Sequence, residues 1–248
     1  MELRAFLTQL DRRGLLTTVE EPLDPAYQVA ERLLQEAEHA TLFREMIAIG
    51  LGVPPAELTT ALASALRQPA EPPRRQTGPC REVAMREPDL NVLPILTHFR
   101  SDPGPYVTAG VVALRDPETG AQNLSFHRLL RLDRRRLAAR LVEGRGAHQA
   151  WTRTSDDLPV AICIGAPVQV LLAGRLTHDL AEEGPFVDLT GTLDIVRQQP
   201  VIEVDRITHR RDAFYQALLP GGLEHRLLMG LPREPTIFEE VAKVCECR

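Results

Sequence analysis

The chain has 248 residues, of which 44% are hydrophobic, 4% aromatic and 25% charged. This length allows one large domain or two small ones and is sufficient to bury a core. With 29 Lys and Arg against 34 Asp and Glu, the formal net charge is -5, which argues against a protein that binds nucleic acid through a general basic field. Four cysteines do not form a disulfide-rich framework.

The sequence also lacks the signals of membrane insertion and export. It contains no apolar run of about 18 residues, and its N-terminus lacks the basic-then-apolar layout of a signal peptide. We therefore expect a soluble, cytoplasmic protein with neither a nucleic-acid nor a membrane partner.

Helical periodicity dominates the N-terminal part. Apolar residues recur at helical spacing over residues 3–10, an Asp-Pro pair begins a second helix that runs to about Glu38, and a Pro-Pro pair begins a third that ends near Arg67. Residues 15–19 predict a short strand. Residues 68–80 are rich in proline and predict a linker, so we place an N-terminal α/β domain at 1–75 and a second domain at 76–248.

Beyond the linker the hydrophobic period changes from 3.6 to 2, which is typical of strands. The sequence predicts strands over residues 106–114, 123–130, 159–165, 201–208 and 214–219, a helix over 134–142 and a last helix after Pro235. There is no alternation of strand and helix, no G-x-G-x-x-G motif and no internal repeat. The fold class that we expect is α+β.

Residues 123–128 are the first candidate for chemistry. Asn123, Ser125 and His127 share one face of the predicted strand, and Arg128 points to the other. A bulge or a strand end would bring Asn123 and Arg128 to one cavity. There, an amide oxygen suits a divalent cation, and a guanidinium suits a carboxylate or phosphate. The alternative is an edge strand with an exposed arginine.

His148 is the second candidate, because it follows the glycine-flanked turn 144–146. Such a histidine is either a ligand or a structural residue.

The third candidate is the acidic segment 182–188. Pro185 restricts the backbone and so keeps Glu183 and Asp188 at a set separation. Two carboxylates in a rigid turn beside an arginine suit proton transfer at a substrate carboxylate, because burial raises one pKa while the arginine lowers the other. The alternative is a solvated acidic turn.

The remaining motifs are weaker. A β-hairpin and a glycine-rich turn are the simplest interpretation of residues 207–212 and 219–222. A phosphate-binding turn is the weaker interpretation. Cys245 and Cys247 have no second pair or histidine cluster that would complete a metal site.

Taken in this order, the segments resemble the UbiD family of prenylated-FMN-dependent decarboxylases. The Glu-Gly-Pro-Phe block at 183–186 and the Thr-His-Arg-Arg-Asp block at 208–212 are its most specific parts. Further matching stretches lie at 89–94, 105–112, 115–120, 158–161 and 219–222, together with Asn123 and Arg128, and the similarity touches most of residues 1–245.

The resemblance implies a small α/β N-terminal domain followed by a split β-barrel, flavin-reductase-like domain that binds the cofactor. Arg128 would hold the substrate carboxylate, and Glu183 would partner that arginine. Asp188 would protonate the carbon after CO2 leaves. Asn123 and His148 would ligate a divalent metal, Mn²⁺ or Mg²⁺, that bridges to the cofactor phosphate.

Ser125, Phe126 and His127 complete the cofactor-binding set that the resemblance implies, together with Asn123, Arg128 and His148. The resemblance also implies K⁺, a flavin prenyltransferase as supplier of the cofactor, and a homodimer or a larger homo-oligomer.

Three features depart from the family. Its third metal ligand, a glutamate, lies upstream of the Glu-Gly-Pro-Phe block, but the segment that should carry it is absent here, where only Asp179 and Glu182 lie nearby. A stretch near residues 42–44 is missing too. The family's C-terminal domain and its lysine have no counterpart, since Lys243 does not match that position. We expect either a reduced or split homologue or a chain from which segments are missing.

The leading prediction is therefore a carboxy-lyase that reversibly decarboxylates an aromatic or α,β-unsaturated acid without oxidation. The alternative is a non-catalytic flavin-binding or assembly subunit of a split decarboxylase. A metal hydrolase that uses His148 and Asp188 is a third, remote interpretation.

Overall fold

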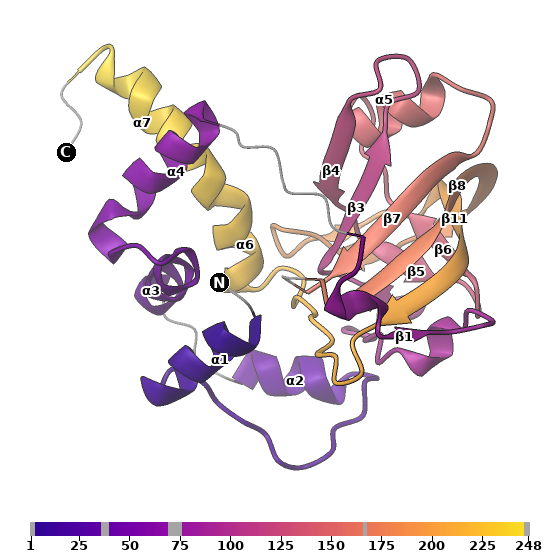
Figure 1. Ribbon diagram of the computed structural model, residues 1–248, viewed down its shortest axis with the longest axis horizontal. Helices are drawn as coiled ribbons and strands as arrows, with labels where there is room; N and C mark the ends of the chain where they lie inside the picture. The colour runs from indigo at the N-terminus through magenta and orange to yellow at the C-terminus, as the bar shows by residue number, and fades with distance from the viewer. Residues whose placement is uncertain (1–2, 36–39, 69–75, 166–167, 246–248) are drawn as a thin grey trace.

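The protein is described by a computed structural model that covers residues 3–35, 40–68, 76–165 and 168–245. Most helices gather on one side of the molecule, and the strands lie on the other together with the short helix at residues 146–152 (Figure 1). The α-helices are α1 (Leu3–Arg12), α2 (Gln28–Gln35), α3 (Ala40–Leu51), α4 (Leu58–Arg67), α5 (Gly146–Thr152), α6 (Leu223–Gly230) and α7 (Glu234–Ala242). Short 3₁₀ turns lie at Pro55–Glu57, Pro79–Arg81, Leu90–Val92 and Leu231–Arg233.

The helical side joins the two ends of the described chain. Helices α6 and α7 lie beside α3 and α4 in Figure 1, although more than 150 residues separate α4 from α6. An ion pair between Arg67 Nη1 and Glu239 Oε1, at 2.7 Å, connects α4 with α7. The amphipathic helix α4 buries Leu58 and Ala63 toward this layer.

The strands form one large antiparallel sheet. They are β1 (Val83–Ala84), β2 (Tyr106–Val107), β3 (Gly110–Arg115), β4 (Gln122–Phe126), β5 (Leu129–Arg131), β6 (Arg136–Ala139), β7 (Leu158–Ile164), β8 (Val170–Glu183) and β11 (Arg197–His209). Their order is β2-β5-β6-β11-β8-β7-β3-β4, with β1 paired to β11. Strands β9 (Phe186–Val187) and β10 (Leu193–Asp194) form a separate two-stranded ribbon.

Strands β8 and β11 are the longest and pair from Val170 and His209 at one end to Glu183 and Arg197 at the other. Their backbones approach closely at Gly174, where a Cβ atom would lie 2.2 Å from the carbonyl oxygen of Glu203. Glycine is therefore required at this position. At the end formed by Glu183 and Arg197 the chain leaves β8, forms the β9–β10 ribbon and returns into β11.

The main core is made largely of residues from this sheet. It is built mainly from aliphatic side chains on alternate strand positions, as in β7, where burial alternates along the strand. The fully buried members include Leu129, Leu137, Ile162, Leu172 and Ile207.

No helix within the described ranges is long and apolar enough to span a bilayer.

Several predicted elements are present. The helix over residues 3–10, the helix that ends at Arg67 and the strands near 106–114, 159–165 and 201–208 all occur, with shifted boundaries. The second helix is described only to Gln35, so its predicted end at Glu38 lies outside the described residues, as do positions 69–75 of the linker.

The helix predicted over residues 134–142 is wrong, because β6 occupies its centre. Leu137, Ala138 and Ala139 are buried, and β6 pairs with β5 on one edge and with β11 on the other. Pairing on both edges outweighs the helical preference of an Arg-Leu-Ala sequence.

The strands predicted over residues 15–19 and 214–219 are also wrong, since both segments are irregular. In the second segment, Leu218 N donates to Thr108 Oγ1 at 2.9 Å. This amide thus bonds to a side chain and not to the backbone of a neighbouring strand. Helices α3 and α6 were not predicted.

Candidate active site

The candidate site begins where the predicted strand 123–130 breaks in two. Strand β4 ends at Phe126 and pairs with β3, whereas β5 begins at Leu129 and pairs with β2 and β6. His127 and Arg128 therefore connect two strands that lie at distant places in the sheet order. The break directs these two side chains into different polar networks.

His127 belongs to a relay on the inner face of β4. Asn123 Nδ2 donates to Ser125 Oγ at 2.9 Å, Ser125 Oγ lies 2.8 Å from His127 Nε2, and His127 Nδ1 lies 2.9 Å from the carbonyl oxygen of Arg140. Burial lowers the pKa of His127, so its imidazole is neutral near pH 7. The relay orients the amide of Asn123. Phe126, in contrast, is 69% exposed.

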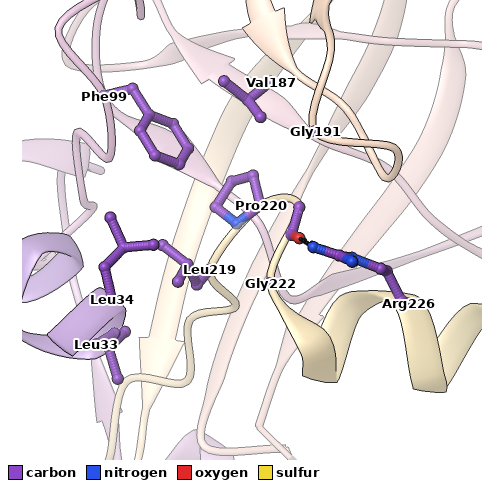
Figure 2. Close-up of a pocket in the computed structure, with 10 residues that line it drawn as sticks. Leu33, Leu34, Phe99, Val187, Gly191, Leu219, Pro220, Gly222 and Arg226 are labelled. Carbon is purple, nitrogen blue, oxygen red and sulfur yellow. Dashed lines mark hydrogen bonds between the residues drawn. The ribbon is translucent and has the colours of Figure 1, made fainter. Parts of the chain in front are cut away.

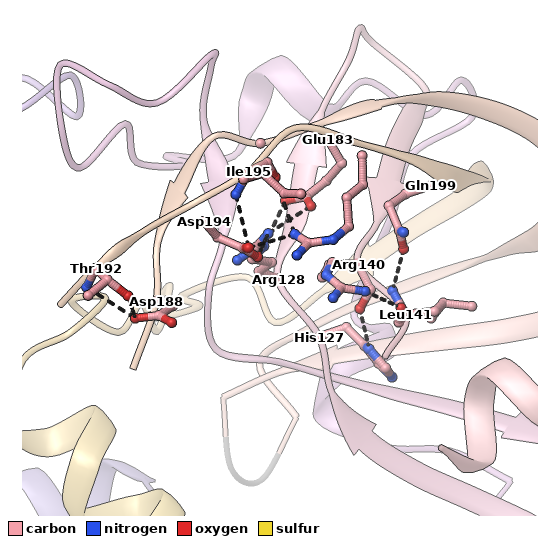
Figure 3. A network of polar contacts seen from close by, with 12 residues as sticks. His127, Arg128, Arg140, Leu141, Glu183, Asp188, Thr192, Asp194, Ile195 and Gln199 are labelled. Atoms are coloured by element: carbon pink, nitrogen blue, oxygen red, sulfur yellow. Dashed lines mark hydrogen bonds and ion pairs between the residues drawn. The ribbon is translucent and has the colours of Figure 1, made fainter. Parts of the chain in front are cut away.

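Arg128 binds Glu183 through two hydrogen bonds (Figure 3). Its Nε donates to Glu183 Oε1 at 2.7 Å and its Nη2 donates to Glu183 Oε2 at 2.9 Å. Glu183 is fully buried, and the hydroxyl of Tyr106 donates to its Oε1 at 3.1 Å. Burial, followed by the charge of Glu183, raises the pKa of Tyr106, so this phenol stays a donor. The ring of Phe186 lies 4.8 Å from the guanidinium carbon of Arg128.

Gly184 is required between Glu183 and Pro185. Its φ is +94°, and a Cβ atom there would lie 2.7 Å from the carbonyl oxygen of Ile195. A side chain at this position would push Ile195 away and shift the neighbouring Asp194. The Gly184–Pro185 peptide is cis.

Asp194 is a member of this site that the sequence did not predict. Its Oδ2 accepts from Arg128 Nη2 at 2.9 Å, and its Oδ1 accepts from Arg197 Nη1 at 2.6 Å and from the Ile195 amide at 2.9 Å. Burial opposes ionisation of Asp194, but hydrogen bonds from Arg197 and Arg128 outweigh it and lower the pKa to about 2. No motif marked Asp194, because its partner lies 66 residues away in the chain.

Arg140 adds a further positive charge beside this cluster. Burial lowers its pKa, and the charges of Arg197 and Arg128 lower it further. The three arginines lie near the carboxylates of Glu183 and Asp194, and the charge of Arg128 also acts on the carboxyl group of Asp102.

Asp188 is held by its own turn. Its Oδ1 accepts from the backbone amides of Thr190 and Thr192, at 2.8 and 3.2 Å, and from their hydroxyls, at 2.6 and 3.1 Å. The Thr190 hydroxyl contributes most to lowering the pKa of Asp188, and burial opposes it only in part. In this arrangement Asp188 is ionised near neutral pH and carries no proton to donate.

His148 lies on α5 and not in an open turn. Its ring meets the edge of Trp151, which stacks on His178 with ring centroids 5.1 Å apart. Asn123 Oδ1 faces the start of the same helix, because a Cβ atom on Gly146 would lie 2.5 Å from it. Both predicted metal ligands thus belong to neighbouring elements.

A complete metal site does not follow from these two residues. Within the described part of the chain, no three His, Cys, Asp or Glu side chains gather in a way that could hold a metal ion. Cys245 is exposed, and Cys247 lies outside the described residues. The described side chains therefore do not complete a metal site by themselves.

A buried polar pair, also not predicted, lies near the site. His98 and Asp102 are 3% and 8% exposed. Asp102 Oδ2 accepts from the amides of His98 and Phe99, whereas Asp102 Oδ1 and both ring nitrogens of His98 have no hydrogen-bond partner among the described residues. Burial lowers the pKa of His98 to about 4 and raises that of Asp102.

An open cavity of about 420 Å³ lies between the helical side and the β9–β10 ribbon (Figure 2). Most side chains that line it are apolar, and Arg226 is the charged residue among them. The lining residues are Leu33, Leu34, Phe99, Val187, Gly191, Leu219, Pro220, Gly221, Gly222 and Arg226. Val187 and Gly191 flank the turn of Asp188, so this cavity borders that turn.

Comparison with known proteins identifies the family. The UbiD family model, described as the 3-octaprenyl-4-hydroxybenzoate carboxy-lyase Rift-related domain, matches residues 71–178 and 169–223. The anhydromevalonate phosphate decarboxylase of Methanosarcina mazei is 34% identical over 305 residues, covering 98% of this chain and 71% of that protein. The enzyme of the same name from Methanothermobacter thermautotrophicus is 37% identical over 245 residues, which cover 80% of this chain and 57% of that protein.

Solved structures show the same fold. The UbiD-class enzyme HmfF from Pelotomaculum thermopropionicum, in complex with FMN, is 26% identical, with a TM-score of 0.89 over 97% of this chain and 70% of that one. An evolved dimeric form of that enzyme, in complex with prFMN, is 25% identical, with a TM-score of 0.88, and the match covers 98% of this chain and 73% of that one.

This chain is shorter than its relatives. It spans between 45% and 71% of the length of four anhydromevalonate phosphate decarboxylases. The alignment with the Methanosarcina protein runs over 305 residues, more than the 248 of this chain, so the relative has internal residues with no counterpart here. The second stretch of the family model begins at residue 169, where β7 has ended and β8 is about to begin. With a match over most of its length, the chain belongs to the UbiD family.

Proposed function

We propose that this chain is the flavin-binding part of a UbiD-type carboxy-lyase, which releases CO2 from an unsaturated carboxylic acid, reversibly and without oxidation. The observation that supports this proposal is the pair of Arg128 and fully buried Glu183. Glu183 takes the Nε and Nη2 side of the guanidinium and so holds the plane of Arg128. The other end of the guanidinium is then oriented to bind a substrate carboxylate.

The substrate need not be aromatic. Curated relatives of this chain are named anhydromevalonate phosphate decarboxylases, so an aromatic ring is not a requirement within the family. We propose an α,β-unsaturated acid as the substrate class.

A flavin is the proposed cofactor, because the relative HmfF is solved in complex with FMN and with prFMN. Ser125, Phe126 and His127 complete the proposed flavin-binding set, together with Asn123 and His148. When bound, prenylated FMN supplies an electron sink for the charge left by departing CO2. The protein supplies orientation through Arg128.

Asp188 is the proposed proton donor, on one condition. Its hydrogen bonds to Thr190 and Thr192 favour the ionised carboxylate, so the turn must release some of them before Asp188 takes up a proton. The cavity beside Val187 and Gly191 leaves space for such a movement.

We propose several further features that the family implies. Asn123 and His148 are the proposed ligands of Mn²⁺ or Mg²⁺, with K⁺ as a second ion. A flavin prenyltransferase is the proposed supplier of the cofactor, and a homodimer or larger homo-oligomer the proposed assembly. We also propose that the chain is divided into domains at 1–75 and 76–248 and that the sheet has the form of a split barrel.

Reconstitution tests the proposal. The chain is co-expressed with a flavin prenyltransferase in the presence of Mn²⁺ and K⁺, and bound flavin is identified by its visible spectrum and by mass spectrometry. CO2 release from a panel of α,β-unsaturated acids is then compared between the parent, Arg128→Lys and a matched control, Arg136→Lys, whose exposed ion pair with Asp133 lies elsewhere.

Modified flavin should copurify with all three proteins, and Arg128→Lys should lose CO2 release by about 100-fold or more, because lysine cannot form the bidentate contact. A protein that binds no flavin, or an Arg128→Lys variant as active as the control, would contradict the proposal.

A non-catalytic flavin-binding or assembly subunit is the second candidate. It is favoured by the metal ligand set, which the described residues do not complete. Bound modified flavin without CO2 release, until a second polypeptide is added, would identify this role.

A further inference from the structure

We propose that Asp194 is an internal carboxylate that competes with the substrate carboxylate for Arg128, and that Arg197 sets the strength of this competition. The inference rests on the proposed function, because it takes Arg128 as the carboxylate-binding residue. It assigns Asp194 and Arg197 as residues that determine how tightly a carboxylate binds.

The geometry of the Arg128 guanidinium shows why Asp194 and a substrate carboxylate would compete. A guanidinium has two sides that bind a carboxylate through a pair of parallel hydrogen bonds: Nε with Nη2, and Nη1 with Nη2. Glu183 occupies the first side of Arg128, at 2.7 and 2.9 Å. Asp194 Oδ2 lies 2.9 Å from Nη2 and so takes half of the second side. A substrate carboxylate bound to that second side meets Asp194.

Asp194, and not Glu183, is the carboxylate that can leave. Glu183 is fully buried and also accepts from Tyr106, whereas the Asp194 side chain is 20% exposed. Asp194 lies on β10, which pairs with β9 through only two residue pairs. Its displacement disturbs a short ribbon and leaves the main sheet intact.

Arg197 makes this displacement inexpensive. Asp194 Oδ1 accepts from Arg197 Nη1 at 2.6 Å, independently of the contact that Oδ2 makes with Arg128. When Asp194 leaves Arg128 it therefore remains paired with a charge, which avoids the penalty of an uncompensated carboxylate.

The charge balance favours exchange of one carboxylate for another. Arg128, Arg140 and Arg197 face Glu183 and Asp194, and a substrate anion that replaces Asp194 at Arg128 restores the same local pairing.

Binding of crotonate, a small α,β-unsaturated carboxylate, tests the inference. Its dissociation constant is measured by NMR titration at pH 7 for the parent, Asp194→Asn, Arg197→Gln and the double variant, with flavin bound and without it. We expect Asp194→Asn to bind crotonate about 5–10-fold more tightly, which corresponds to roughly 1.0–1.4 kcal/mol.

Arg197→Gln should bind crotonate several-fold more weakly, because Asp194 then depends on Arg128 alone. In the double variant this effect of Arg197→Gln should vanish, because the competing carboxylate is gone. Asp205→Asn is the matched control: it removes one negative charge from an exposed pair with Arg175 and should leave the affinity unchanged. Thermal unfolding confirms that each variant is folded.

The outcomes separate this inference from the proposed function. If Asp194→Asn binds crotonate no more tightly than the parent, while Arg128→Lys abolishes binding, the competition is overturned and the role of Arg128 stands. An equal gain in Asp194→Asn and Asp205→Asn would also overturn it, as a general charge effect. If neither the parent nor Asp194→Asn binds crotonate, both the inference and the carboxylate-binding role of Arg128 fail.

Discussion

Two carboxylates five residues apart, Glu183 and Asp188, occupy opposite kinds of surroundings. Glu183 is fully buried and is held by Arg128 and Tyr106, which come from distant parts of the chain. Asp188 is partly exposed, and its carboxylate is held by Thr190 and Thr192 of its own turn. The carboxylate of Glu183 is thus fixed by hydrogen bonds from distant parts of the chain, whereas the hydrogen bonds to the carboxylate of Asp188 come from its own turn.

The difference matters for what each carboxylate can do. A buried carboxylate that accepts hydrogen bonds from two residues holds an arginine in place, because movement of the arginine would leave a buried charge unpaired. A carboxylate that caps its own turn can move when a few weak local bonds open. Glu183 is thus suited to positioning, and Asp188 to a step that requires movement.

The largest expected effect comes from removing Arg128. Arg128→Met leaves Glu183 buried without its charge partner and should lower the free energy of unfolding by about 3–5 kcal/mol, measured by urea denaturation. Arg136→Met removes an exposed ion pair with Asp133 and should cost about 1 kcal/mol or less. Equal losses of unfolding free energy in the two variants would show that the pair of Arg128 and Glu183 does not fix this part of the structure.

Asp194 should contribute stability that depends on pH. Its folded-state pKa of about 2 lies below the ordinary value of 3.8, so its ionised form stabilises the folded state above about pH 4, and this contribution is lost as the pH falls toward 2. At pH 7 the parent should exceed Asp194→Asn by about 2 kcal/mol in the free energy of unfolding.

That difference should shrink to near zero by pH 2, as followed by denaturation at a series of pH values. A gap that does not change with pH would mean that Asp194 is not held by its arginine partners. The loss of stability, set against the expected gain in crotonate affinity, is a typical exchange of stability for function.

Tyr106→Phe sharpens the comparison at the buried end. The hydroxyl donates to Glu183 Oε1 at 3.1 Å and accepts from the amide of Gly184 at 3.2 Å. Its removal should cost about 1–2 kcal/mol in the free energy of unfolding, because a buried amide and a buried carboxylate each lose a partner. Thermal unfolding that is unchanged from the parent would indicate that Arg128 alone fixes Glu183.

The smallest effect is expected at Asp188. Asp188→Ala removes the acceptor of four hydrogen bonds in an exposed turn and should cost about 1 kcal/mol, in the range of a lost cap. Asp188→Asn keeps an acceptor oxygen and should cost less, about 0.5 kcal/mol. A loss at Asp188 as large as that of Arg128→Met would contradict the distinction between the two ends.

Local pattern in the sequence was sufficient for part of this protein. Apolar spacing predicted the helix at residues 3–10 and the strands near 106–114 and 201–208, because each depends on its own periodicity. The specific blocks at 183–186 and 208–212 were sufficient to indicate the family. The polar segments 123–128 and 182–188 brought Arg128, Glu183 and Asp188 forward as candidates, whose roles stay proposals.

Only the tertiary structure decided the rest, because it depends on residues that are far apart in the chain. Residues 136–139 became a strand since β5 and β11 offer both edges of a ladder. Asp194 joined the site because the β9–β10 ribbon folds back onto Arg128. The ionised state of Asp188 follows from the closure of its turn. Residue types determine which groups are available, and the long-range backbone pairing determines which of them meet.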